Sequence, residues 1–141
     1  MIKKPTDELM DELLKANSIS EYLKENSQYM VSDELATYLN NIMAKKGLVK
    51  SDVIKKTEFS EVMGYQIFAG TRQPSRDSLI CICVAMNMSL EETQTLLKIS
   101  GFAALYPKSK RDSIIIKGIS ENKTVAKINE ELYNCEEKTL T

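Results

Sequence analysis

The sequence predicts an all-α protein. Apolar residues recur at helical spacing along nearly the whole chain, and the alternation typical of β-strands is almost absent. The breaks between apolar segments are short and polar. With 141 residues, 43% of them hydrophobic and 28% charged, the chain has the composition of a globular protein of one domain with an extension. We expect about eight or nine helices with short connections.

An acidic helical segment is expected over residues 1–32. Residues 1–34 carry four basic and eight acidic side chains, a net charge of −4. Ser18 with Glu21 three residues later matches a capping box and opens a second helix. The first helix is marked by an apolar stripe made of Leu9, Met10, Leu13 and Leu14.

Five helices are expected over residues 33–100, in the order long, short, short, buried and capped. Ser32 precedes the long helix, which stops at Gly47, a residue type that favours helix ends. Two short helices follow, over residues 51–57 and 60–69. The apolar stripe of the long helix consists of Leu35, Leu39, Ile42 and Met43.

The remaining helices include the one expected to be the most buried, because residues 79–86 are apolar on every side. Ser89 with Glu92 is a second capping box, and the helix that it opens runs to Gly101. A C-terminal helical hairpin is expected over residues 101–141.

This hairpin is predicted to be a copy of the preceding one. Residues 75–105 and 110–140 align without a gap at an offset of 35 residues, and Arg76-Asp77-Ser78 recurs as Arg111-Asp112-Ser113. Further identical pairs are Ile80 with Ile115, Asn87 with Asn122, Leu97 with Leu132 and Leu105 with Leu140. Two copies are few for a repeat array, so we expect a packed extension.

Composition excludes several kinds of chemistry. The chain has no His, which removes His general bases, Ser-His and Cys-His pairs and imidazole zinc sites. Its three Cys form no CxxC motif, so reduced thiols and a cytoplasmic location are expected, with Cys81 and Cys83 as buried apolar residues. No segment is apolar for long enough to span a bilayer. We expect no catalysis, no cofactor and no metal.

The net charge of −1 conceals an uneven distribution. Residues 35–78 carry seven basic and four acidic side chains, and residues 98–117 carry five basic and one acidic. Basic residues are therefore concentrated in the middle of the chain, as expected for a surface that faces phosphates.

The two short helices and the loop after them carry a family resemblance. Thr57-Glu58-Phe59 joins the helices, and residues 65–75 read Tyr-Gln-Ile-Phe-Ala-Gly-Thr-Arg-Gln-Pro-Ser, followed later by Ser-Leu-Glu-Glu at 89–92. Over residues 33–100 the chain resembles the Cro/repressor (XRE-type) helix-turn-helix family, in a bacterial subgroup with a C-terminal extension. The resemblance implies a five-helix repressor-like domain.

The chain departs from the family pattern at four places. One is Phe68-Ala69, which replaces the acidic residue that usually precedes the closing glycine. Glu58 stands where a small residue is usual in the turn, and Ile54 stands where the second helix usually has Ala. Gly64 occupies a position in the middle of the third helix that is usually apolar, at a cost of up to about 1 kcal/mol in helix propensity.

The resemblance implies a set of DNA-binding residues. Lys50 would anchor a phosphate, the start of the third helix and Gln66 would read base edges, and the following loop would hold further phosphates. The set consists of Lys50, Ser60, Glu61, Tyr65, Gln66, Thr71, Arg72 and Arg76.

Structural alternatives stand beside these assignments. Tyr65 and Phe68 could be core aromatics, and for Phe68 this is the favoured interpretation. Arg111 is more consistent with a structural ion pair than with phosphate binding. A solvated face without function is an equal alternative for Lys45, Lys46, Lys55 and Lys56.

The sequence therefore favours a transcriptional regulator that binds double-stranded DNA, as a homodimer on a two-fold site. The alternative is a protein-interaction adapter or antitoxin-like module that has the same scaffold and does not read DNA. Its partner would bind the N-terminal or C-terminal helices. The pI of about 5.6 and the two acidic residues Glu58 and Glu61 favour this alternative.

Overall fold

The computed structural model describes residues 4–141, apart from the side chains of residues 31–33. In that part of the chain it contains nine α-helices, one 3₁₀ helix and no strand, which confirms the all-α class. The elements are α1 (Thr6–Lys15), α2 (Ile19–Glu25), η1 (Ser27–Tyr29), α3 (Val31–Lys46), α4 (Lys50–Lys56), α5 (Glu61–Ala69), α6 (Arg76–Ala85), α7 (Leu90–Ile99), α8 (Lys110–Ser120) and α9 (Val125–Asn134).

Most helix ends lie where local signals place them. The hydroxyl of Ser89 accepts from the backbone N–H of Glu92, whose carboxylate accepts from the N–H of Ser89, so this capping box is complete. Gly47 ends α3 with a φ of 66°, in the left-handed region that glycine tolerates. The expected start of α3 after Ser32 is wrong, because the helix begins at Val31, with Met30 as its N-cap.

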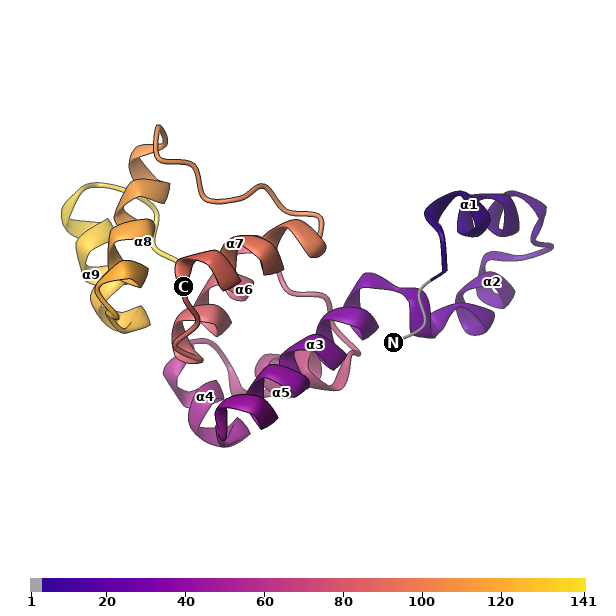
Figure 1. Ribbon diagram of the computed structural model, residues 1–141, viewed down its shortest axis with the longest axis horizontal. Coiled ribbons are helices and arrows are strands. Elements are labelled where there is room, and N and C mark those ends of the chain that lie inside the picture. The colour runs from indigo at the N-terminus through magenta and orange to yellow at the C-terminus, as the bar shows by residue number, and fades with distance from the viewer. Residues whose placement is uncertain (1–3) are drawn as a thin grey trace.

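The core is built around α6. Every residue from Leu79 to Ala85 is buried, as the apolar character of this segment predicted. α4 contacts both α5 and α6, while α3 packs against α5 (Figure 1). The side chain of Asn40 joins α3 to the end of α5 by donating to the carbonyl oxygen of Phe68 at 2.9 Å.

The two predicted copies share hydrogen bonds at the offset of 35 residues. Arg76 Nε donates to the carbonyl of Ala103 at 3.0 Å, and Arg111 Nε donates to that of Lys138 at 2.8 Å. Asn87 and Asn122 both adopt positive φ, at 53° and 55°. Two further equivalent contacts join side chain to backbone, Gln94 with Leu105 and Asn129 with Leu140.

The copies also pair with each other reciprocally. The Arg76 guanidinium binds both carboxylate oxygens of Asp112, at 3.2 and 3.0 Å, and Arg111 binds both oxygens of Asp77, at 3.0 and 3.1 Å. α6 contacts α9, and α7 contacts α8. Such an exchange of equivalent contacts is the pattern of a two-fold interface, here formed within one chain.

The outer face of the second copy differs from that of the first. In the first copy, Met86, Met88 and Leu96 are all buried in the core. At the equivalent positions the second copy has Glu121, Lys123 and Glu131. Lys123 Nζ lies 3.4 Å from Glu121 and 2.6 Å from Glu131, so the apolar cluster of the first copy is replaced by an ion-pair network.

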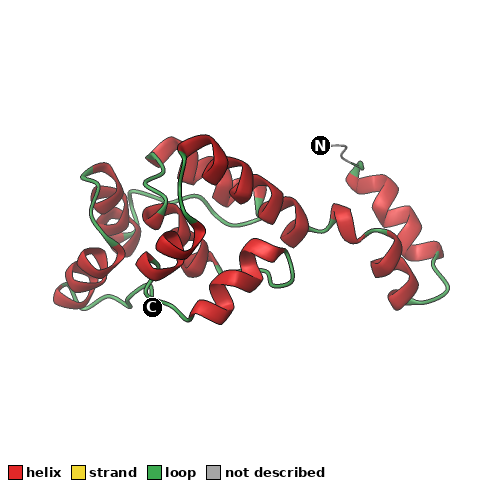
Figure 2. Cartoon of the chain, turned by 90° about the horizontal axis from the view of Figure 1, so that it is seen from below, coloured by secondary structure: helices red, strands yellow, loops and turns green. Residues whose placement is uncertain are grey.

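The α1–α2 hairpin projects from one end of the molecule, and α8–α9 lie at the opposite end (Figures 1 and 2). α1 has no buried residue along its length. None of the helices described is long and apolar enough to cross a membrane.

Candidate nucleic-acid interface

The turn between α4 and α5 fixes the direction in which α5 runs. The buried hydroxyl of Thr57 donates to the carbonyl of Ile54 at 2.6 Å and closes the end of α4. Glu58 then adopts a φ of 67°, a left-handed conformation in which glycine would be less strained. Ser60 caps α5 by accepting from the N–H of Met63 at 3.2 Å.

The inner side of α5 is held by an unusual contact with α4. Gly64 is buried, and a Cβ added there would lie 2.7 Å from Ile54 Cγ2. The large side chain of Ile54 thus fills the space that a side chain at position 64 would need. Ile67 and Phe68 are buried on the same side, which confirms the core interpretation of Phe68.

The outer side of α5 is exposed and mixed in character. Val62 is 68% exposed and Tyr65 is 46% exposed, so Tyr65 is not a core aromatic. Glu61 and Ala69 are also exposed on this helix. The outer side therefore offers apolar contact area and one carboxylate, close to the polar side chains at the end of the helix.

Those polar side chains are joined to one another. Arg72 Nη1 donates to Gln66 Oε1 at 3.4 Å, and the hydroxyl of Thr71 donates to the carbonyl of Gln66 at 3.2 Å. Gly70 allows this arrangement, because its φ of 81° turns the chain back over the last turn of α5. Gln66, Thr71 and Arg72, three of the predicted site residues, are thus brought together.

The predicted lysines fall into different environments. Lys50 opens α4, and its ammonium lies 5.8 Å from the centre of the Phe68 ring, a cation–π contact. Lys46 pairs with Glu92 at 3.2 Å, so it is already engaged within the fold. Lys45, Lys55 and Lys56 are exposed.

Arg76, one of the predicted DNA-binding residues, makes several bonds within the protein. Besides its two bonds to Asp112, it donates to the carbonyls of Ala103 and Ala104. Four of its five N–H donors are thus used within the protein. Arg111 is engaged in the same way with Asp77, which confirms the structural interpretation of that residue.

Two exposed apolar residues lie near the predicted site residues. Val62 lies on the outer side of α5, and Val49 precedes α4 with most of its side chain exposed. Valine is usually a core residue, so its type alone gives no signal of exposure. The outward position of Val62 follows only from knowing that Gly64, Ile67 and Phe68 face the core.

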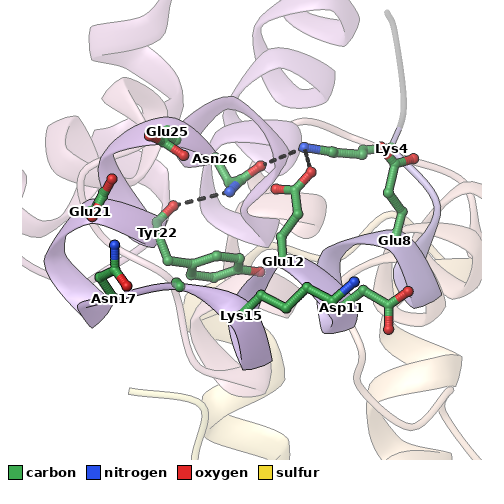
Figure 3. Close-up of a pocket in the computed structure, with 11 residues that line it drawn as sticks. Lys4, Glu8, Asp11, Glu12, Lys15, Asn17, Glu21, Tyr22, Glu25 and Asn26 are labelled. Carbon is green, nitrogen blue, oxygen red and sulfur yellow. Dashed lines mark hydrogen bonds and ion pairs between the residues drawn. The ribbon is translucent and has the colours of Figure 1, made fainter.

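A polar groove of about 440 Å³ lies between α1 and α2, far from α5 along the chain (Figure 3). Lys4 spans it, pairing with Glu12 and donating to Asn26 at 3.0 Å. The hydrogen bond between Lys4 and Glu12 raises the pKa of the lysine and lowers that of the carboxyl. Among the described residues, no group of three or more Cys, Asp or Glu side chains is arranged to hold a metal ion.

The thiols of α6 are shielded from solvent. Burial raises the pKa of Cys81 and of Cys83 to about 12. Since the thiolate is the reactive form, neither is suited to nucleophilic chemistry at neutral pH. Cys135 is exposed after α9.

Comparison with known proteins gives no relative from which a role could be transferred. No protein-family model, curated protein or solved structure matches the chain.

Proposed function

We propose that the protein is a cytoplasmic DNA-binding regulator that inserts the outer side of α5 into the major groove. The observation that carries this proposal is the two-sided character of α5. One side is anchored by Gly64, Ile67 and Phe68, and the other presents Val62, Tyr65 and Gln66. A helix enters a groove in this way, because its inner side fixes its position while its outer side reaches base edges.

The residues around α5 have distinct roles in this proposal. Gln66 offers a donor and an acceptor to adenine, and Val62 offers a methyl contact to thymine. Arg72 and Lys50 supply charge for phosphates on either side of the groove. Glu61 accepts from the amino group of cytosine, and Ser60 and Thr71 contribute hydroxyls at the two ends of the helix.

The proposal is tested by fluorescence anisotropy with duplex DNA, using a preferred sequence selected from genomic fragments and a scrambled control. Gln66→Ala is expected to weaken the free energy of binding to the preferred duplex by about 1–3 kcal/mol and to change binding to the scrambled duplex little. Arg72→Ala should weaken binding to both and reduce the salt slope, which is about −0.9 per neutralised phosphate. Ile67→Ala is the folding control and should lose about 2–5 kcal/mol of stability.

A protein-interaction module on the same scaffold is the second candidate. The observation that favours it is the exposure of three apolar side chains in and before α4 and α5, Val49, Val62 and Tyr65, with Glu58 and Glu61 also exposed. Such surfaces often mark protein-binding sites. Absence of DNA binding at low salt, with wild-type melting behaviour in Gln66→Ala and Arg72→Ala, would favour this candidate.

A further inference from the structure

The surface that joins the first hairpin, α6–α7, to the second hairpin, α8–α9, is self-complementary. Each hairpin contributes an Arg and the Asp that follows it, and each Arg binds the Asp of the other hairpin through two bonds between 3.0 and 3.2 Å long. The helices exchange in the same way, because α6 contacts α9 while α7 contacts α8 (Figure 1). Both sides of the interface therefore present the same groups, as two identical subunits do about a two-fold axis.

The first hairpin of another chain would offer the same groups as the second hairpin of this one. The Arg-Asp dipeptide is identical in the two copies and stands at the same point of the repeat. Two apolar pairs are also identical and fully buried, Ile80 with Ile115 and Leu97 with Leu132. What covers α6–α7 in the structure is thus a copy of α6–α7 itself, and this identifies the partner that the surface accepts.

The ion pairs make this surface selective. The side chains of Arg76 and Asp112 are 24% and 10% exposed, and those of Arg111 and Asp77 are 19% and 22% exposed. Like charges brought together at this depth would repel strongly, because partly buried charges are poorly screened by salt. The surface therefore accepts a hairpin with the order Arg-Asp and rejects one with the order Asp-Arg.

The connection between α7 and α8 holds the second hairpin in place. The side chain of Gln94 accepts from the N–H of Leu105 at 2.7 Å and donates to its carbonyl at 2.8 Å. Arg76 donates to the carbonyls of Ala103 and Ala104 in the same connection. A partner on a short tether acts as if it were present at about millimolar concentration. A second chain at micromolar concentration is therefore outcompeted by the hairpin of the same chain.

We propose that the α8–α9 hairpin is a built-in partner, which occupies the surface on which the α6–α7 hairpins of two chains would otherwise pair about a two-fold axis. The self-pairing surface is closed within each chain, so the protein works as a monomer. This arrangement replaces the homodimer that the sequence favoured. It stands independently of DNA binding, because it rests on the two hairpins alone.

Exchanging the two charges of one hairpin tests the proposal. Arg111→Asp/Asp112→Arg sets like charges against Arg76 and Asp77 and leaves the first hairpin intact, so α6–α7 should pair with the same hairpin of a second chain. In sedimentation equilibrium at micromolar concentration, the wild type should have the mass of one chain, 15.9 kDa, and the variant should have twice that mass. Arg76→Asp/Asp77→Arg creates the same conflict from the first hairpin and should also give a dimer.

Two controls separate charge matching from the loss of contacts. Arg111→Gln/Asp112→Asn removes the ion pairs without creating like charges, so the tether should keep this variant a monomer. The variant that combines both exchanges restores opposite charges within the chain, and it should be a monomer with wild-type helicity by circular dichroism. The proposal is overturned if the wild type is a dimer, if neither exchanged variant forms a discrete dimer, or if the neutral or the combined variant dimerises as strongly as they do.

Discussion

At the scale of single residues, Ile54 and Gly64 form one compensating pair. Considered alone, each of these two residues looks unfavourable at its position. In the structure the Ile54 side chain occupies the space beside the backbone of Gly64. The large side chain at position 54 is thus matched by the missing side chain at position 64. Gly118 and Ile128 form a similar pair in the C-terminal hairpin, where a Cβ on the glycine would lie 2.5 Å from Ile128 Cγ1.

Gly64→Ala tests this pairing. Alanine favours a helix by about 1 kcal/mol, but the clash with the buried Ile54 side chain should outweigh this gain and destabilise the protein by about 1–3 kcal/mol. Ile54→Ala alone should cost about 2–5 kcal/mol by leaving a cavity. Urea unfolding should show that the double variant loses less stability than the sum of the two single variants. Simple additivity would contradict the pairing.

At the scale of elements, the reciprocal ion pairs join the first turns of α6 and α8. Asp112 is the more buried of the two acids, with 10% of its side chain exposed. Burial alone would raise the pKa of Asp112, but hydrogen bonds from the Arg76 guanidinium and the Tyr106 backbone N–H outweigh it and lower the pKa. The ionised form is thus favoured by folding.

This lowered pKa predicts acid sensitivity. The unfolded chain binds a proton at Asp112 near pH 4, whereas the folded chain binds it only at lower pH. The stabilisation is therefore complete above about pH 4 and is lost as the pH falls through the folded pKa. Asp112→Asn should lower the free energy of unfolding by about 1–3 kcal/mol at neutral pH. Urea unfolding at several pH values should also show that the variant loses less stability than the wild type on acidification. Asp52→Asn, at an exposed position on α4, is the control and should keep the wild-type profile.

At the scale of the whole molecule, the second hairpin packs against the first. Its apolar residues, such as Ile115 and Leu132, are buried. At the positions where the first hairpin packs into the core, the second hairpin carries ion-paired residues instead. A repeat with a polar outer face offers a further copy no apolar surface on which to stack.

Reciprocal exchanges between the copies should have unequal effects. Lys123→Met/Glu131→Leu replaces a partly exposed ion pair with the residues of the first copy and should leave stability unchanged or higher. Met88→Lys/Leu96→Glu brings the same ion pair into the core and should cost about 1–4 kcal/mol or more. Thermal melting of the two double variants checks this. Equal losses would show that the two faces have equivalent surroundings.

Local signals in the sequence determined the helices and their order. Caps such as Ser89 with Glu92 and turn glycines such as Gly47 act through neighbours a few residues away, so they can be recognised without the fold. The repeat was also visible, because equivalent contacts require equivalent residues at a constant offset. The start of α3 shows the limit, because its N-cap is Met30, whose side chain makes no capping hydrogen bond and therefore gives no local signal.

Only the tertiary structure decided which face of each helix is covered. A stripe such as Leu9 to Leu14 shows that one side of α1 is apolar, but whether that side is buried depends on what the rest of the chain brings against it. The same holds for Val62, which lies outside because Gly64 and Ile67 face α4 and the core, and for Arg76, whose partner Asp112 lies 36 residues away. Periodicity is a property of neighbours along the chain, whereas burial and ion pairing depend on residues that only folding brings together.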